Sequence, residues 1–172
     1  MSESCKAHVE WIVEKYEGDY KSKKEILKAG VKPYEVIKKT KNILLREGIQ
    51  LLWTLAIGGT GTPWNNANAH IGVGDGTAAA SRDQTGLQGT NKYYKGMDSG
   101  FPVVEEDTSV SPSTYRVVFQ STFGGDEANF AWQEMTVANG NSDAAVNLNR
   151  LVQNMGTKSS GTWIAICKIR LT

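Results

Sequence analysis

The chain has few of the residues that most enzyme sites and disulfide scaffolds require. Its 172 residues include two histidines, His8 and His70, and two cysteines, Cys5 and Cys167. No zinc-binding spacing and no Gly-x-Ser-x-Gly motif surrounds the histidines, so we expect His70 to be hydrogen-bonded or exposed rather than a ligand. A disulfide would have to join the two ends of the chain, and we do not expect one.

Net charge and long apolar runs are also lacking. The formal net charge is +1 and the pI is near 7.7, which argues against a general attraction to nucleic acid or to an anionic membrane. The longest apolar run, around Ile49–Ile57, is interrupted by Gln50 and Thr54 and is too short to span a membrane. The charged N-terminus has no apolar signal-peptide region, so we expect synthesis in a cytoplasm with no membrane partner.

Glycine is abundant and proline is scarce, since the sequence contains 18 glycines and four prolines. The strongest local pattern is Ser113–Val137, in which two alternating segments flank Gly124-Gly125-Asp126. Alternation is typical of strands that bury one face, and a Gly-rich reversal between two strands predicts a hairpin. In the second segment the alternation predicts that Trp132 and Glu134 share one face.

Further strands are predicted around this hairpin. Ala69, Ile71 and Val73 alternate before the Asp75-Gly76 turn, and a final strand runs from Thr162 to the last residue after a turn at 158–161. The sequence therefore predicts a mainly β fold, an antiparallel β-sandwich of jelly-roll-like type, with an N-terminal helical or extended arm. The aromatic residues at alternating positions are expected in its core: Tyr115, Phe119, Phe130, Trp132 and Trp163.

The segments between the strands are predicted to be loops. Gly72, Gly74 and Gly76 suggest a phosphate-binding loop, but no G-x-G-x-x-G, no Gly-Lys-Ser/Thr and no following helix completes one. Residues 77–91 form a polar loop that Leu87 should anchor, and residues 103–113 form an acidic, solvated connection. Adjacent acidic residues within 105–107 do not converge as metal ligands would.

Residues 1–32 are predicted to form an arm, with two alternatives for 8–20. Val9, Ile12, Val13 and Tyr16 have helical spacing, and the same stretch can also form a short strand. Ser22 with Glu25 three residues later predicts a capped helix that ends at Gly30.

Residues 33–59 are predicted to form a helical segment that leads into a sandwich domain at 60–172. Pro33 suits a first helical turn, Thr40 is a candidate N-cap, and Gly58-Gly59 is a stop signal. Gly48 within this pattern suggests close approach to a neighbouring element. The lysines and the arginine at 38–46 are expected to form a solvated face rather than a binding patch.

No catalytic, cofactor-binding or metal-binding set is predicted, and the protein is expected not to be an enzyme. Glu127 and Glu134 would act as a glycosidase pair only if the fold brought them together, and their odd separation places them on opposite faces. Aromatic residues in the arm and the loops are the candidates for contact with a partner: Trp11, Tyr16, Tyr20, Trp64, Tyr93 and Tyr94.

Several motifs between residues 68 and 172 together resemble a pattern in virion proteins of tailed bacteriophages. In order they are IGVGD at 71–75, LQGTN at 87–91, KGMDSG at 95–100, EANFAW at 127–132 and TKSSGTW at 157–163. Glu134 stands where similar sequences keep an acidic residue, although the QEMTVANG that surrounds it departs from their usual strand ending.

The resemblance implies a structural component of a phage particle with a β-sandwich body. Its expected partners are the major capsid protein or tail components and copies of itself, and its expected location is the virion. We expect a decoration or head-fibre-type protein on the capsid surface, with residues 1–57 as the attachment. The alternatives are a tail or baseplate accessory protein, and a receptor- or glycan-binding module that uses Trp64, Tyr93 and Tyr94.

Overall fold

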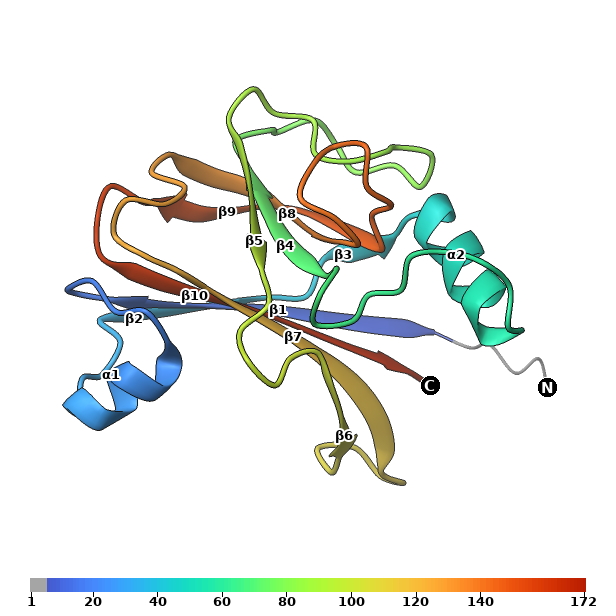
Figure 1. The fold of residues 1–172 in the computed structure, drawn as a ribbon, viewed down its shortest axis with the longest axis horizontal. Coiled ribbons are helices and arrows are strands. Elements are labelled where there is room, and N and C mark those ends of the chain that lie inside the picture. Colours follow the sequence, from blue (N-terminus) through green and yellow to red (C-terminus); the bar gives the residue numbers. More distant parts are fainter. Residues whose placement is uncertain (1–5) are drawn as a thin grey trace.

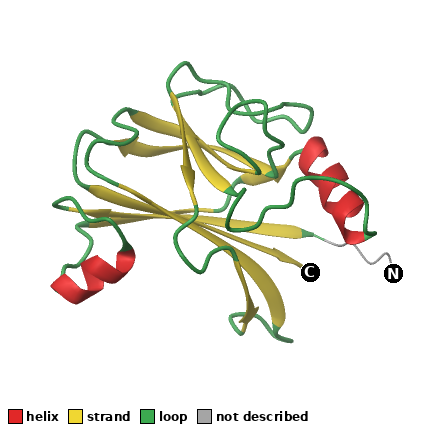
Figure 2. Ribbon diagram, in the orientation of Figure 1, coloured by secondary structure: helices red, strands yellow, loops and turns green. Residues whose placement is uncertain are grey.

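Ten strands within residues 6–172, the part of the chain that this computed structural model describes, form two antiparallel sheets of five strands (Figures 1 and 2). Strands make up 43% of the chain and helices 11%, so the predicted mainly β sandwich is confirmed. Sheet A has the order β2 (Glu35–Lys39), β1 (Ala7–Tyr16), β10 (Thr162–Leu171), β7 (Thr114–Phe123) and β6 (Val103–Asp107). Sheet B has the order β3 (Asn42–Leu44), β9 (Asn149–Thr157), β8 (Ala131–Ala138), β4 (His70–Gly74) and β5 (Lys92–Gly96). The helices of this part are α1 (Lys23–Ala29) and α2 (Arg46–Ala56).

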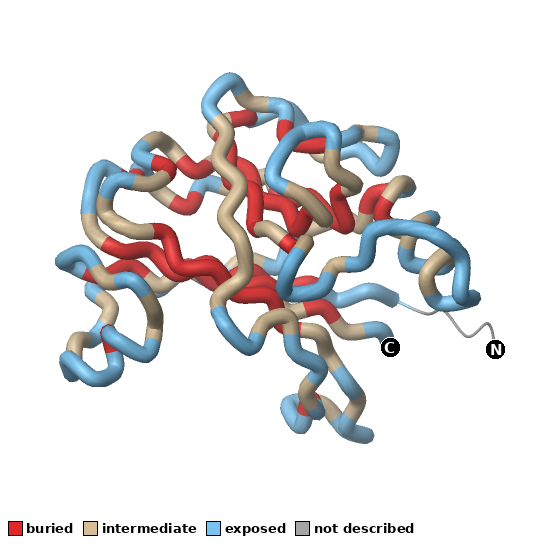
Figure 3. Tube along the Cα trace, in the orientation of Figure 1, coloured by how far each residue is buried: buried red, intermediate tan, exposed pale blue. Residues whose placement is uncertain are grey.

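An aromatic cluster lies in the core between the sheets, which Figure 3 shows as the buried interior. The ring of Trp132 lies 4.8 Å from that of Phe123 and 4.9 Å from that of Trp163, both edge-on, an arrangement that favours aromatic pairs. Phe119, Trp132 and Trp163 are buried as predicted, and Phe130 packs against the cluster. The prediction for Tyr115 is wrong, because 68% of this residue is exposed where β7 extends past the core.

The predicted hairpin at Ser113–Val137 is wrong, although both of its strands are present. β7 pairs with β10 and β6 in sheet A, whereas β8 pairs with β4 and β9 in sheet B. The Gly-rich connection therefore crosses between sheets, and the 158–161 connection from β9 to β10 does the same. Each strand buries one face in the same core, so alternation alone does not distinguish a hairpin from such a crossing.

The predicted alternation of β8 is also corrected. Trp132 and Met135 both enter the core, and a register shift separates Trp132 from Glu134. An irregularity of this kind moves the residues beyond it to the other face. As a result Glu134 and Thr136 point away from the core that Trp132 helps to fill, and they are buried on the outer side of sheet B.

The strand alternative for the N-terminal segment is confirmed, and the helical alternative is wrong. β1 pairs with β10 from Ala7↔Leu171 to Tyr16↔Thr162, and with β2 on its other side. Residues 1–32 are therefore not an arm separate from the sandwich, because one of the inner strands of sheet A comes from them. Residues 1–5, with Cys5, lie outside the described part, and Cys167 is buried in the core.

The short helix that follows β1 has the predicted caps. The Ser22 hydroxyl accepts a hydrogen bond from Glu25 N, and Gly30 adopts a left-handed conformation at the C-terminus. Ile26 of this helix is 1% exposed and packs on the outer face of sheet A against a cluster that includes Ile12 and Ile164. α1 thus covers a second, smaller apolar cluster.

The helix of the 33–59 segment is shorter than predicted. Pro33 precedes strand β2, and the N-cap position of α2 is Leu45 rather than Thr40. The chain extends at 35–39 because Ile37 pairs with Val13 and packs on the core, so tertiary pairing overrides the local helical pattern. α2 ends at Ala56, and Gly58 follows with a φ of 78°, as the stop signal predicted.

The segment predicted as an acidic, solvated connection contains the edge strand β6. It pairs with β7 from Val103↔Val118 to Asp107↔Thr114. Asp107 is only 2% exposed, so a loop in solvent was the wrong interpretation. Adjacent acidic residues hide this strand in the sequence, because strands are depleted in Asp and Glu.

Gly48 should not tolerate a side chain, because α2 approaches the backbone before β9 there. A Cβ at this position would lie 2.5 Å from Leu148 Cα and 2.6 Å from Asn147 O. Alanine favours a helix over glycine by about 1 kcal/mol, but displacing packed backbone costs about 1–3 kcal/mol. We expect Gly48→Ala to lower the free energy of unfolding in denaturant titrations. Gln50→Ala, on the exposed side of α2, is the control and should change it by less than about 0.5 kcal/mol; a stabilised Gly48→Ala would contradict the close approach.

Candidate functional site: polar networks and exposed apolar surfaces

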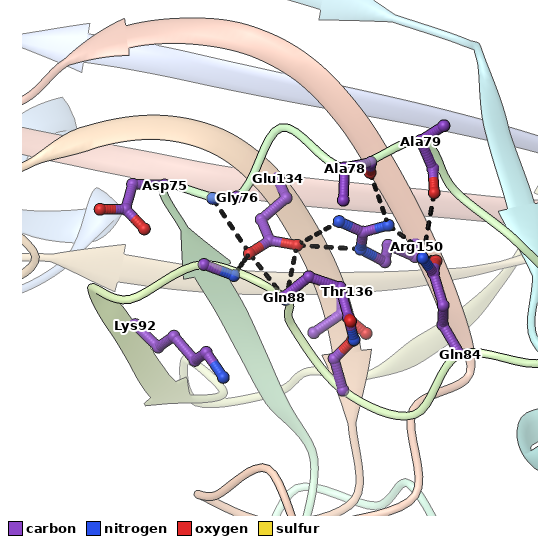
Figure 4. A network of polar contacts seen from close by, with 12 residues as sticks. Asp75, Gly76, Ala78, Ala79, Gln84, Gln88, Lys92, Glu134, Thr136 and Arg150 are labelled. Carbon is purple, nitrogen blue, oxygen red and sulfur yellow. Dashed lines mark hydrogen bonds and ion pairs between the residues drawn. The ribbon is translucent and has the colours of Figure 1, made fainter.

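A fully buried ion pair is the centre of a polar network on the outer side of sheet B (Figure 4). Glu134 of β8 and Arg150 of β9 are both 0% exposed. Arg150 Nη2 and Nε donate to Glu134 Oε2 at 2.7 and 2.9 Å. Burying two charges costs several kcal/mol for each ion unless further hydrogen bonds satisfy them, so the other contacts of this pair decide whether it is tolerated.

The loop between β4 and β5 supplies those contacts. Glu134 Oε1 accepts hydrogen bonds from Gly76 N at 3.2 Å, Gln88 N at 3.0 Å and Gly89 N at 2.7 Å. Arg150 Nη1 donates to Ala78 O at 3.0 Å and to Gln84 Oε1 at 2.7 Å. The ion pair therefore fixes both ends of the 75–91 loop against the outer face of sheet B. Leu87 is 2% exposed, which confirms it as the predicted apolar anchor.

The glycines at the end of β4 are explained by this carboxylate. A Cβ on Gly74 would lie 2.6 Å from Glu134 Oε1, and a Cβ on Gly76 would collide with the same oxygen. Glycine-rich backbone that presents N–H groups is a common anion-binding device. Here the anion that it binds is a side chain of the protein itself, which is why the glycines lack the rest of a phosphate-binding motif.

Two further aspartates fix loop backbone in the same way. Asp75 accepts bonds from Thr90 N, Asn91 N and Asn91 Nδ2, and the bond from the Asn91 side chain lowers the pKa of Asp75 most. Asp98 accepts bonds from Gln120 Nε2, Thr122 N and Thr122 Oγ1, which attach the loop after β5 to β7. These contacts account for the aspartates of the IGVGD and KGMDSG motifs.

Lys158 joins the two connections that cross between the sheets. It is 1% exposed, and its ammonium donates to Gly124 O at 2.7 Å, Asn129 Oδ1 at 2.9 Å and Gly125 O at 3.3 Å. Burial lowers the pKa of Lys158, while the surrounding acidic residues oppose that shift. One charged side chain thus satisfies several oxygen atoms of the β7–β8 connection from the β9–β10 connection.

Residues of the IGVGD, LQGTN, KGMDSG, EANFAW and TKSSGTW motifs therefore have structural roles in this fold. The odd spacing of Glu127 and Glu134 does not apply as predicted, because Glu127 lies in the connection before β8 and a register shift precedes Glu134. The two carboxylates have different partners: Glu127 bonds to Lys95 and Tyr93, whereas Glu134 bonds to Arg150. Among residues 6–172, no three His, Cys, Asp or Glu side chains are grouped as a metal ion would require. His70 Nδ1 lies 2.8 Å from Asn68 O, as expected of a hydrogen-bonded histidine.

Comparison with known proteins adds no relative to this description. No family model, no curated protein and no solved structure matches the chain. No helix in the described part has the length and apolar character to cross a membrane.

The predicted partner-contact residues divide into two groups. Trp11 is 0% exposed and Tyr16 is 4% exposed within sheet A, so the prediction that they contact a partner is wrong for both. Their alternating positions in β1 place them in apolar clusters instead. The other four are partly buried, and their role stays a prediction: Tyr20, Trp64, Tyr93 and Tyr94.

Two exposed apolar surfaces were not predicted. The first, which we call the helix surface, consists of Leu52, Trp53 and Ile57, and Ile57 is 84% exposed. The second, the sheet-end surface, consists of Val104, Tyr115 and Leu171, where the inner face of sheet A continues beyond the core. In Figure 1 the β6–β7 end of sheet A projects away from sheet B. The sequence does not reveal this surface, because apolar residues alternate in the same way in a strand that the second sheet covers and in a strand that it leaves exposed.

A charged cluster lies on the outer face of sheet A, behind the sheet-end surface, and holds its strands together. Asp107 accepts hydrogen bonds from Ser109 Oγ, from Arg170 Nη1 at 2.9 Å and from Arg116 Nη1 at 3.2 Å. The Ser109 hydroxyl first, and then Arg170, hold the pKa of Asp107 well below its usual range. Arg116 also donates to Glu105, so the cluster ties β6, β7 and β10 together.

Replacing Glu134 should detach the 75–91 loop. Glu134→Gln keeps the shape of the side chain but leaves the buried Arg150 cation unpaired, so we expect a loss of about 3–5 kcal/mol in the free energy of unfolding. Arg82, exposed in this loop, offers a trypsin site, and cleavage after it should be faster in the variant. Asp83→Asn removes the exposed Arg46–Asp83 pair and serves as the control, with a loss of at most about 1 kcal/mol. Equal cleavage rates in the wild type and both variants would contradict the role of Glu134 in holding the 75–91 loop.

Asp107 should contribute stability in a pH-dependent manner. Its pKa is lower in the folded than in the unfolded chain, so its contribution is complete above about pH 4–5 and is lost as the pH falls through the folded pKa. We expect Asp107→Asn to unfold at lower denaturant concentration than the wild type at pH 7, with the difference shrinking towards pH 2. Glu106→Gln, on the exposed neighbour, should show no such convergence, and a difference constant from pH 7 to pH 2 would refute the assignment.

Proposed function

We propose that the protein is a non-enzymatic structural component of a tailed-phage particle, attached to the capsid surface as a decoration or head-fibre-type protein. The motifs that resemble those of phage virion proteins support it, and so does the sandwich that they hold together. Its partners on this proposal are the major capsid protein and copies of the chain itself, and its location is the virion.

The sheet-end surface is the observation that carries the proposal. Val104 and Tyr115 are each 68% exposed and Leu171 is 48% exposed. Cross-strand pairing places Val104 beside Val117 and Val117 beside Ile169, so Val104 continues an apolar row of the sheet. Tyr115 lies two residues before Val117 on the same face of β7, where its partner on β6 is Glu106. A contiguous exposed apolar surface on a folded domain marks an interaction site more often than isolated apolar residues do.

The structure also makes this end suitable for bearing a contact. Asp107, Arg116 and Arg170 bind one another across three strands on the opposite side of the sheet. The apolar side chains therefore stand on a pre-ordered support, and binding orders few additional residues, which lowers its entropic cost. Many copies on a symmetric particle would add avidity to a modest single contact.

This proposal replaces attachment through an N-terminal arm. Residues 7–16 are an inner strand of sheet A, so a deletion of residues 1–32 would remove β1 and damage the fold itself. A deletion test would then report unfolding rather than attachment. Substitutions of exposed residues avoid that problem.

The glycan-binding alternative has less support. The Tyr93 hydroxyl donates to Glu127 at 2.9 Å and the Tyr94 hydroxyl donates to Asp143 at 2.6 Å. Both phenols thus already have partners within the chain, and Trp64 packs against the core. A tail or baseplate accessory protein would use the same kind of surface. The experiment below distinguishes it from a protein of the capsid surface.

We expect the double variant Val104→Thr/Tyr115→Thr to bind purified heads that lack this protein at least tenfold more weakly than the wild type in co-sedimentation. Threonine is a β-branched residue that strands favour, and it removes apolar area at both positions. Leu27→Gln, which changes a residue of α1 that is 69% exposed, is the matched control and should bind normally. Unchanged binding by the double variant would exclude the sheet-end surface as the attachment. Wild-type binding to purified tails but not to heads would contradict the capsid location, and binding to neither would contradict the proposed function.

A further inference from the structure

The two edges of sheet A carry opposite charge. β2 forms one edge and β6 forms the other, and neither has a further strand beside it within residues 6–172. Residues 21–41, which include α1 and β2, contain eight lysines and two glutamates, a net charge of +6 in a chain whose total is +1. β6 consists of two valines followed by three acidic residues. Positive and negative charge are therefore separated between opposite edges of one sheet.

Both edge strands are open to solvent. Val36 of β2 is 46% exposed, and Val103 and Val104 of β6 are 39% and 68% exposed. An edge strand presents a row of N–H and C=O groups to which a strand of another chain can bind. At β6, sheet A projects away from sheet B (Figure 1), so sheet B of the same chain leaves room for a neighbour there.

The strand directions decide how the two edges can meet. Each neighbouring pair in sheet A is antiparallel, so β2 and β6, which are four pairings apart, run in the same direction. Copies that repeat in one orientation along the sheet bring β6 of one copy parallel to β2 of the next. Such a head-to-tail contact joins two different surfaces, and it closes into a ring or continues as an open chain according to the rotation between copies.

In one parallel register the two strands match on both faces of the sheet. Pairing with Ile12 puts Lys38 on the outer face of sheet A, and pairing with Val117 puts Val104 on the inner face. Side chains alternate between the faces along each strand. With like faces side by side, the neighbours are Val36 and Val103, Ile37 and Val104, Lys38 and Glu105, and Lys39 and Glu106. An antiparallel contact of the same strands brings either the valines together or both lysines beside acidic residues, but not both at once.

The charged groups of this register are accessible. Glu106 and Lys38 are exposed, and Lys39 is partly exposed. None of the three forms an ion pair with a described residue. Glu105 pairs with Arg116, but 42% of its side chain is exposed, so its carboxylate can accept a second cation. The contact thus brings together charges that a single chain leaves unpaired.

We infer that copies of the chain assemble head to tail through these edges, with β6 of one copy adding to β2 of the next. Backbone hydrogen bonds extend sheet A from copy to copy. The lysine–glutamate neighbours select the register, because complementary charges favour one arrangement and like charges oppose others. Tyr115 and Leu171 stand on β7 and β10, away from the edge, and remain open to the capsid. The inference goes beyond the proposed function and concerns contacts between copies.

The experiment is light scattering coupled to size-exclusion chromatography over a range of protein concentrations. The wild type should exceed the mass of two chains, because a head-to-tail pair still has one free edge of each kind. Lys39→Glu and Glu106→Lys each place like charges across every contact. Each variant alone should therefore associate at least tenfold more weakly and have the mass of one chain.

A mixture of the two variants provides the rescue. Contacts between unlike copies again have opposite charges at positions 39 and 106, so the equimolar mixture should regain the masses of the wild type. Lys24→Glu, which makes the same change of charge on an exposed residue of α1, is the control and should assemble normally. If Lys39→Glu lowers the melting temperature, Lys38→Glu is measured alone in its place and should have the mass of one chain.

Several results would overturn the inference. A wild type with the mass of one chain at every concentration would show that the charges only protect the edges from pairing. A mass that stops at two chains, an edge variant that assembles alone, a mixture that stays at one chain, or a Lys24→Glu variant that dissociates would also overturn it. Assembly by a chain that does not bind heads would contradict only the proposed function, and head binding by a chain that stays single would contradict only this inference.

Discussion

The need to satisfy a buried carboxylate organises one half of this molecule. Glu134 is surrounded by protein on the outer side of sheet B, where its charge is tolerated only with an arginine and several N–H donors around it. The donors come from the 75–91 loop, and that loop approaches closely enough because positions 74 and 76 are glycine. A register shift in β8 turns Glu134 away from the core that Trp132 fills. The 75–91 loop, the two glycines and the register shift together therefore allow the Glu134 carboxylate to be buried.

Lys158 has the corresponding role at the other end of the sandwich. Both connections that cross between the sheets meet at its ammonium, which donates to Gly124 O and Asn129 Oδ1. A sandwich whose strands change sheets needs ordered crossings, because buried carbonyl groups left without partners are costly. Asn129 belongs to the EANFAW motif and Lys158 to the TKSSGTW motif, so these motifs contribute to holding the body together. Evidence for a partner has to come from other residues.

Those residues form two surfaces of different character. The sheet-end surface is apolar with acidic neighbours and has ion-paired strands behind it, which suits a partner of different composition. The helix surface has no charge, and Trp53 and Ile57 stand on the side of α2 that faces away from the sandwich. The proposed capsid attachment uses the first of these surfaces.

The sequence by itself determined the strands β4, β7, β8 and β10, the Ser22 and Gly30 caps, the Leu87 anchor and the close approach at Gly48, because local conformation and spacing depend on neighbours along the chain. Only the tertiary structure decided which strands pair. Alternation at 113–137 fits a hairpin and a crossing equally well, and β1 has helical spacing although β10 and β2 pair with it. It also decided which apolar side chains are exposed: Trp11 and Tyr115 both stand on the inner face of sheet A, yet one is covered by the core and the other is not. Whether a residue of sheet A is covered depends on how far sheet B extends over it, and no local sequence pattern encodes that extent.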